Sequence, residues 1–229
     1  MTLSRRPTLS ALAIALLAGL AASARAVPLD NGFSGQNFLD TPLAGTTAAA
    51  RPELAGLVVA DTDTPFSVGG VTGFVQNRVV REFGTGTLDF YWRVALDPAT
   101  DGNAGITAFR LDGFGYNDVT DADDRIDGLG TVPASTARLF NPGSYPQGDI
   151  NFLFGSAIEA GQSSQFFFLH TDAVAFAMTA DYDFVTGADL IGGAGPTYAP
   201  AVPEPAPAAL LALGVLTLAG LRSRRGKQG

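Results

Sequence analysis

Between residues 88 and 96 every second side chain is large and apolar, and this alternation limits the fold more than any other feature of the sequence. Successive side chains of a strand point to opposite faces, so the pattern predicts an antiparallel strand with one face buried. The apolar side chains are Leu88, Phe90, Trp92, Val94 and Leu96, and those between them are Asp89, Tyr91, Arg93 and Ala95.

The same alternation recurs on both sides of this segment. In a preceding strand, the apolar face carries Val75, Val79 and Phe83, and the outer, solvent-facing side carries Gln76, Arg78 and Glu82. Glycines within residues 84–87 predict the hairpin turn that joins the two strands, because glycine adopts positive φ angles readily. A later strand has an apolar face made of Val174, Phe176, Met178, Ala180, Tyr182 and Phe184. Weaker patterns predict strands at 56–60, 106–114, 149–154 and 165–171.

About seven short strands separated by Gly, Pro, Asn and Asp predict an all-β fold, an antiparallel β-sandwich or jelly-roll-like domain, over residues 27–186. The 16 phenylalanines would fill the space between two sheets. We expect an irregular or edge-like start at 27–54 and long loops at 97–105 and 116–145. Residues 187–201 have the composition of a Gly/Pro/Ala linker.

Composition excludes several kinds of site and partner. The chain has no cysteine, hence no disulfide, thiolate zinc site or cysteine nucleophile. A single histidine, His170, is too few for the usual multi-histidine metal centres. Residues 27–200 carry seven arginines, no lysine and 21 acidic residues, a net charge of −14 that argues against nucleic acid as a partner.

Residues 1–26 have the three parts of a secretory signal peptide. A basic start is followed by an apolar run at 9–20 and by small residues that satisfy the rule for cleavage. We therefore expect an N-terminal signal helix that is removed on export, with an uncleaved anchor as the alternative. The general secretory route is favoured over the twin-arginine route, whose motif the sequence matches only in part. The basic residues are Arg5 and Arg6, and those at the cleavage position are Ala24, Ala26 and Val27.

The C-terminus predicts a membrane span followed by a basic end. Residues 206–221 carry no charge, and as a helix they would be about 24 Å long, close to the thickness of a bilayer core. By the positive-inside rule, the arginines after this span would stay in the cytoplasm. Before the span, Pro203 and Pro205 keep Glu204 extended and accessible, because neither proline fits the interior of a helix or sheet.

These parts together resemble the PEP-CTERM sorting signal of Gram-negative bacteria, over residues 202–227, with the transmembrane helix at 206–221 and the basic tail at 222–227. The residues that carry the resemblance are Val202, Pro203, Glu204, Pro205, Arg222, Arg224 and Arg225. It implies transient anchoring in the inner membrane, recognition by exosortase, a transpeptidase-like membrane protease, and delivery to the cell surface or extracellular matrix. Such proteins are typical of bacteria that make exopolysaccharide and biofilm. The alternative is an ordinary C-terminal anchor after a Pro-rich segment.

Five aspartates crowd a short segment in the second of the expected loops, and bound calcium would relieve their mutual repulsion. Their spacing does not match the EF-hand pattern, so a solvated acidic loop is the alternative. No other cofactor is expected. The five candidate ligands are Asp118, Asp121, Asp123, Asp124 and Asp127.

No catalytic constellation stands out in the sequence. A glycosidase needs two positioned carboxylates, and although Glu82 and Glu159 are present, no spacing singles out a pair. His170 reads as a surface residue at the end of a strand, and Trp92 as a core residue rather than a sugar platform. We therefore expect a non-enzymatic surface or matrix protein that binds or organises material such as exopolysaccharide. The alternatives are a matrix polysaccharide hydrolase and a calcium-stabilised adhesin.

Overall fold

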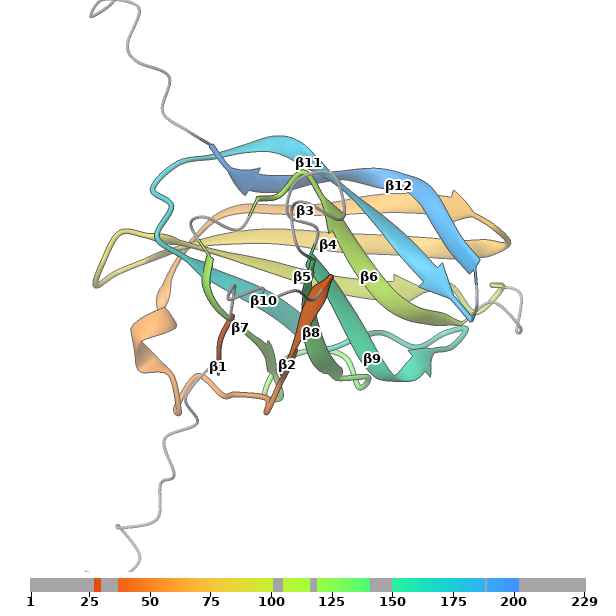
Figure 1. Cartoon of the computed structure of the whole chain (residues 1–229), viewed down its shortest axis with the longest axis horizontal. Helices are drawn as coiled ribbons and strands as arrows, with labels where there is room; N and C mark the ends of the chain where they lie inside the picture. The colour runs from red at the N-terminus through yellow and green to blue at the C-terminus, as the bar shows by residue number, and fades with distance from the viewer. Residues whose placement is uncertain are drawn as a thin grey trace, which may run out of the picture.

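The structure of the protein is a computed structural model that describes residues 27–29, 37–100, 105–115, 119–140, 150–187 and 189–201. Within these ranges the chain forms twelve strands, arranged as two six-stranded sheets in which every neighbouring pair is antiparallel. Figure 1 shows β3, β4 and β5 of one sheet running behind β6, β8 and β9 of the other. The expected all-β fold with two antiparallel sheets is therefore confirmed.

The two sheets are named here by the order of their strands. Sheet I consists of β1 (Val27–Pro28), β7 (Val119–Arg125), β10 (Phe166–Thr171), β5 (Leu88–Leu96), β4 (Val71–Glu82) and β3 (Gly56–Val68). Sheet II consists of β12 (Asp189–Pro200), β11 (Phe176–Thr186), β6 (Ile106–Asp112), β9 (Ile150–Ile158), β8 (Ala134–Phe140) and β2 (Phe38–Pro42). The early strands β1 and β2 lie at sheet edges, which agrees with the edge-like character of the chain's beginning.

The main core lies between the sheets and is built from the inward faces that the alternation predicted. On β5 the even-numbered side chains from Leu88 to Leu96 enter this core, and Trp92 lies at its centre with 1% of its surface exposed. Around the indole pack the rings of Phe109, Phe152 and Phe167, with ring centroids 6.0–6.2 Å from it. Phenylalanine therefore fills the inter-sheet space, as expected from its abundance.

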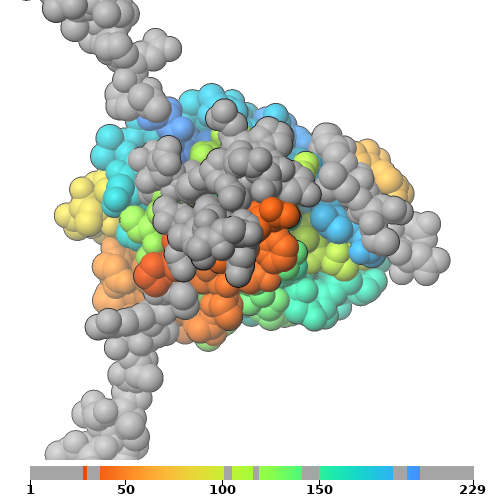
Figure 2. All heavy atoms as spheres, in the orientation of Figure 1, coloured from red at the N-terminus to blue at the C-terminus, as the bar shows by residue number. Residues whose placement is uncertain are grey.

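A second, smaller apolar cluster covers the opposite, outward face of sheet I. It forms because the segment 43–55, which includes the 3-10 turn η1 (Pro52–Leu54), folds over β4, β5 and β10. Figure 2 shows residues of this segment, in orange, on the outside of the molecule. Its members are Leu54, Val80, Tyr91, Phe166 and Phe168. Strand β5 is consequently buried on both faces, whereas the sequence predicted burial of one face only.

Two segments expected to lack regular structure contain strands. The long loop predicted at 116–145 holds β7 and β8, and the linker predicted at 187–201 holds β12, which pairs with β11 from Phe176↔Pro200 to Thr186↔Asp189. These strands were not predicted because their sequences are polar or rich in small residues and show no apolar face. They form because they pair with neighbouring strands. The domain thus extends to Pro200.

Three side chains assigned to strand faces differ in exposure from the prediction. Val174 and Met178 were placed on an apolar face but are 58% and 45% exposed: Val174 precedes the strand, which begins at Phe176, and Met178 lies where the pairing of β11 with β12 shifts register. Phe83, also placed inside, lies past the end of β4 and is exposed. Glu82 lies on the outward face as predicted, but it is buried there because residues 43–55 and the 84–87 turn cover that end of the sheet.

The expected signal peptide at 1–26 and the sorting segment at 202–227 lie outside the described residues. Among the residues that the structure does describe, no helix is both long and apolar enough to cross a membrane.

Candidate functional site

Three ionisable side chains from three strands of sheet I meet on its outward face: Glu82, Asp89 and His170. Glu82 ends β4 and Asp89 lies at the start of β5, so the hairpin turn at 84–87 brings them together. In that turn Gly86 has the positive φ of 77° that the sequence predicted for a glycine there. His170, near the end of β10, is the direct cross-strand partner of Asp89.

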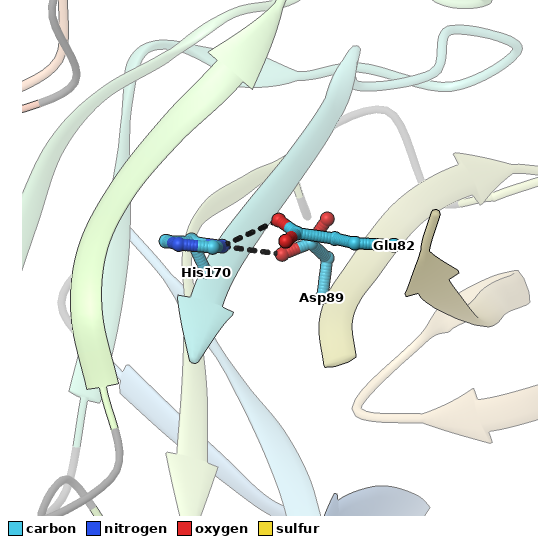
Figure 3. Close-up of side chains that lie close together, drawn as sticks. All are labelled: Glu82, Asp89 and His170. Carbon is cyan, nitrogen blue, oxygen red and sulfur yellow. Dashed lines mark hydrogen bonds and ion pairs between the residues drawn. The ribbon is translucent and has the colours of Figure 1, made fainter. Parts of the chain in front are cut away.

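The imidazole of His170 contacts both carboxylates through one nitrogen. Its Nδ1 lies 2.7 Å from Oδ1 of Asp89 and 3.1 Å from Oε1 of Glu82, as the dashed lines in Figure 3 show. Potential ligand atoms of the three residues all lie within 4.8 Å of one another. The three strands therefore converge on a space that a proton or a single ion can occupy.

Burial controls the acid–base properties of this cluster. Asp89 is fully buried and Glu82 is 3% exposed. Burial raises the pKa of Asp89 to about 6, although its hydrogen bond with His170 pulls the value down. Burial lowers the pKa of His170, but the hydrogen bond with Asp89 and the charges of Asp89, Asp121 and Glu82 outweigh it, so the pKa is raised overall. The imidazole therefore favours its charged form.

Neighbouring groups hold the carboxylates in place. The hydroxyls of Thr85 and Thr87 both donate to Oε2 of Glu82, which leaves Oε1 directed at His170. On the adjacent strand β7, Asp121 is the cross-strand partner of His170, and the Arg51 guanidinium binds both of its oxygens at 2.9 and 3.1 Å. Within the described part of the chain, Oδ2 of Asp89 accepts no hydrogen bond, and Oε1 of Glu82 meets Nδ1 of His170 as an ion pair rather than as a hydrogen-bond acceptor.

A surface cavity of about 350 Å³ opens further along the same face of sheet I. The rings of Tyr91 and Phe166, both nearly buried, belong to its lining. Two guanidinium groups, of Arg78 and Arg125, also line it, and Arg78 lies 4.9 Å above the centre of the Phe166 ring. Apolar side chains complete the lining, namely Leu54, Val58, Val80 and Leu129.

Both cavity arginines are partly neutralised by aspartates. Arg78 pairs with Asp61 at 2.7 Å and Arg125 with Asp127 at 2.9 Å. These pairs are partly exposed to solvent, where such interactions are weak, so the guanidinium groups remain available to an anionic ligand. Guanidinium groups beside exposed apolar side chains, those of Val58 and Leu129, suit a negatively charged molecule that also has an apolar face.

The aspartates expected to bind calcium are used in another way. They lie on β7 and in the turn after it, where they bind the segment 45–51 that crosses the sheet. The Asp123 carboxylate accepts a hydrogen bond from the Gly45 N–H at 2.9 Å, and the Asp127 carboxylate accepts one from the Ala48 N–H at 2.6 Å. Asp121 is bound by the guanidinium group of Arg51. Asp124 is buried with its carboxylate beside Gly45, and Asp118 lies outside the described residues.

Three of these aspartates are thus engaged by the segment 45–51, and none of those within the described part of the chain belongs to a group of three acids or histidines close enough to share an ion. Among the described residues, the group of three close enough to share an ion is Glu82, Asp89 and His170. From their sequence positions, Glu82 and His170 were both predicted to lie at the surface. The predicted hairpin places residues 82 and 89 at the same end of two neighbouring strands, so the sequence could have indicated that Glu82 and Asp89 lie close together. The pairing of β10 with β5, which adds His170, is not evident from the sequence.

Glu159, the other acid considered for glycosidase chemistry, follows the end of β9 and is not part of this cluster. Trp92 is a core residue, as predicted. The sorting residues Val202, Pro203, Glu204, Pro205, Arg222, Arg224 and Arg225 and the cleavage residues Ala24 and Ala26 lie outside the described residues, and Val27 begins β1. Comparison with protein-family models, curated proteins and solved structures found no match to this chain.

Proposed function

We propose that this protein is an exported, non-enzymatic component of the cell surface or extracellular matrix, sorted by exosortase and bound to acidic exopolysaccharide. The observation that carries the sorting part is the C-terminal order of Pro203-Glu204-Pro205, an uncharged apolar stretch and an arginine cluster, in a chain that starts like a secreted precursor. The arginine–aromatic cavity on sheet I supports the binding part.

The position of the sorting motif follows from the end of the sandwich. Strand β12 ends at Pro200, so Pro203 comes only three residues later. With so short a connection, a precursor anchored through residues 206–221 would hold its sandwich against the outer surface of the inner membrane. Cleavage near Glu204 would release an intact domain, because the last strand precedes the motif.

The sorting proposal is tested by following the full chain in its own cells after two separate changes, Glu204→Ala and deletion of residues 222–225. Each change removes one element of the motif and leaves residues 27–201 intact. We expect both variants to remain in the inner membrane while the unaltered chain reaches the surface or matrix. Normal surface delivery of both variants would remove exosortase from the proposal.

The binding proposal rests on charge and shape at the cavity. A uronic acid residue has an apolar face that can contact the exposed side chains of Val58 and Leu129, and its carboxylate matches the guanidinium groups of Arg78 and Arg125. Because residues 27–200 are strongly acidic overall, such a polymer would be attracted only at local basic sites of this kind.

The test measures binding of the purified full chain to a uronate polymer such as alginate and to neutral dextran. We expect binding to the uronate polymer alone, and Arg78→Gln should weaken it by about tenfold. Arg138→Gln is the matched control, because Arg138 also pairs with an aspartate and lies over a ring, that of Phe38, but on sheet II. Equal affinity in both variants would exclude this cavity as the binding site.

The hydrolase alternative is less well supported by the site. In the Glu82, Asp89 and His170 cluster the carboxylates are buried, and the nearest cavity is lined by arginines and rings rather than by a pair of acids. Incubation of the protein with the same uronate polymer distinguishes the two functions, because release of new reducing ends from the polymer would favour a hydrolase. A Tm that is unchanged between calcium and chelator would count against the calcium-stabilised adhesin.

A further inference from the structure

The Glu82, Asp89 and His170 cluster has more negative charge than its surroundings balance. Two buried carboxylates face one imidazole, and a third carboxylate, that of Asp121, is already paired with Arg51. Among the described residues, the buried Oδ2 of Asp89 accepts no hydrogen bond, and the buried Oε1 of Glu82 is left with the ion pair to His170 at 3.1 Å. Buried acceptors in native proteins are nearly always satisfied, so two buried carboxylates that share one imidazole nitrogen, with oxygens that accept no hydrogen bond, indicate that a cation belongs there.

The donor atoms narrow the choice of cation. Calcium and magnesium are bound by oxygen atoms, calcium by six to eight of them, and neither suits an imidazole nitrogen. One nitrogen and two carboxylates are a donor set for divalent transition metals, of which zinc tolerates low coordination numbers best. We propose that Glu82, Asp89 and His170 bind a divalent transition-metal ion, with Zn²⁺ as the ion that fits best.

The distances between the ligand atoms show how the cluster would have to adjust to hold such an ion. Ligand atoms about 2.0–2.1 Å from a tetrahedral zinc are roughly 3.3 Å apart. Nδ1 of His170 is 2.7 Å from the Asp89 oxygen and 3.1 Å from the Glu82 oxygen, so both distances widen by a few tenths of an ångström when the ion replaces the shared proton. The two carboxylate oxygens lie within 4.8 Å of each other, and binding sets their distance to about 3.3 Å. The fourth position is left to water, which reaches the cluster beside His170, whose side chain is 18% exposed.

The contacts behind the ligands have the arrangement that metal sites require. Thr85 and Thr87 fix the Glu82 carboxylate by hydrogen bonds to the oxygen that faces away from His170. Such supporting hydrogen bonds orient ligands and contribute to affinity. The bound ion links β4, β5 and β10, and it joins residues 81 positions apart in a chain that has no disulfide to do so. Its role is therefore to stabilise sheet I.

The first test uses the fact that His170 is the only histidine in the chain. The full chain, purified in detergent without a histidine tag, is labelled with ¹⁵N-histidine and titrated with ZnCl₂ after treatment with chelator. We expect the Nδ1 resonance to shift strongly, the Nε2 resonance to change less, and saturation at one equivalent. Unchanged Nδ1 and Nε2 resonances, or a shift of Nε2 alone, would overturn the proposal without any variant having to fold.

The second test compares affinities and Tm values. Zn²⁺ should raise the Tm by several degrees, since an ion bound only by the folded state stabilises it. Glu82→Gln and His170→Asn should each weaken binding by at least about tenfold. Asp127→Asn is the control, because this acid is paired with Arg125 outside the cluster. Equal Zn²⁺ affinity in all variants, or a larger Tm increase with Ca²⁺ than with Zn²⁺, would also overturn the proposal.

Discussion

Three polar side chains cross the core of the sandwich. The indole Nε1–H of Trp92 on β5 donates to Thr197 on β12, and the Thr197 hydroxyl donates to Asn77 on β4, with both distances 2.7 Å. All three residues are at most 1% exposed. The Thr197 hydroxyl is thus the hydrogen-bond partner of both Trp92 and Asn77, and it connects sheet II, to which it belongs, with sheet I.

We predict that Thr197→Val lowers the free energy of unfolding by about 2 kcal/mol or more, because it removes the partner of the Trp92 N–H and of the Asn77 Oδ1 at nearly unchanged volume. Urea denaturation followed by Trp92 fluorescence measures the change. Thr62→Val is the control: this hydroxyl contacts Tyr198 at the exposed surface, so its loss should cost less than about 0.5 kcal/mol. Similar losses for both variants would contradict the role of the bridge.

Asp124 on β7 is a buried acid without a side-chain partner. Burial and then the charge of Asp123 raise its pKa to about 7, whereas the pKa of an aspartate in the unfolded chain is about 3.9. The folded state therefore binds more protons than the unfolded state between about pH 4 and 7. This residue lowers stability progressively as the pH rises through that range, and the loss is complete above about pH 7.

Asp124→Asn should consequently stabilise the protein, and the gain should be larger at pH 8 than at pH 5 by about 1–3 kcal/mol. Urea denaturation at the two pH values measures it. Asp61→Asn is the contrasting control: burial alone would raise the pKa of Asp61, but hydrogen bonds from Arg78 and Gln76 lower it, so its removal brings no gain that grows with pH. A gain at Asp124 that does not depend on pH would refute the argument.

The alternation of apolar and polar residues correctly predicted the strands that have one face in the core. It did not predict the strands that have no apolar face and form through pairing with a neighbour. β5 and the later part of β11 were predicted correctly because Trp92, Tyr182 and their neighbours recur every second residue. β12 was missed because glycine, alanine and proline give no such pattern. Its partner β11 supplies the hydrogen bonds, and only the assembled sheet makes that pairing available.

Truncation of the chain can test whether residues 187–201 form a structural strand or a linker. Of two chains that both begin at Val27, the one ending at 201 should unfold cooperatively in urea, as a complete sandwich does. The one ending at 187 lacks β12, and with it Thr197 and the partner of β11, so it should lose the cooperative transition and the near-UV circular dichroism of Trp92. Matching transitions for the two chains would restore the linker interpretation.

At the scale of the whole molecule, the topology joins segments that are far apart in sequence. In sheet I the central strand β10 pairs with β7 and β5, and β1 at its edge pairs with β7 about 90 residues later. Residues 45–51 then cross this sheet and bind the aspartates of β7. Few of these contacts are local, so most of the fold forms only after distant segments meet.

Refolding from urea should therefore be slow for a domain of this size, on the time scale of milliseconds to seconds or longer. Stopped-flow fluorescence measures it directly, because Trp92 is the only tryptophan and lies at the centre of the core. Thr197→Val should mainly accelerate unfolding if β12, the last strand, joins late. Complete refolding within microseconds would contradict this account.

The sequence by itself determined the all-β class, the inward face of β5, the hairpin turn and the acidic surface, because each depends on neighbouring residues and on local backbone preference. Tertiary structure decided which outward faces are buried. Glu82, Asp89 and His170 were individually visible in the sequence, but β10 had to pair with β5, and residues 43–55 had to cover sheet I, before they became a buried cluster. Burial and proximity of charges are properties of the assembled sheets, and no local pattern encodes them.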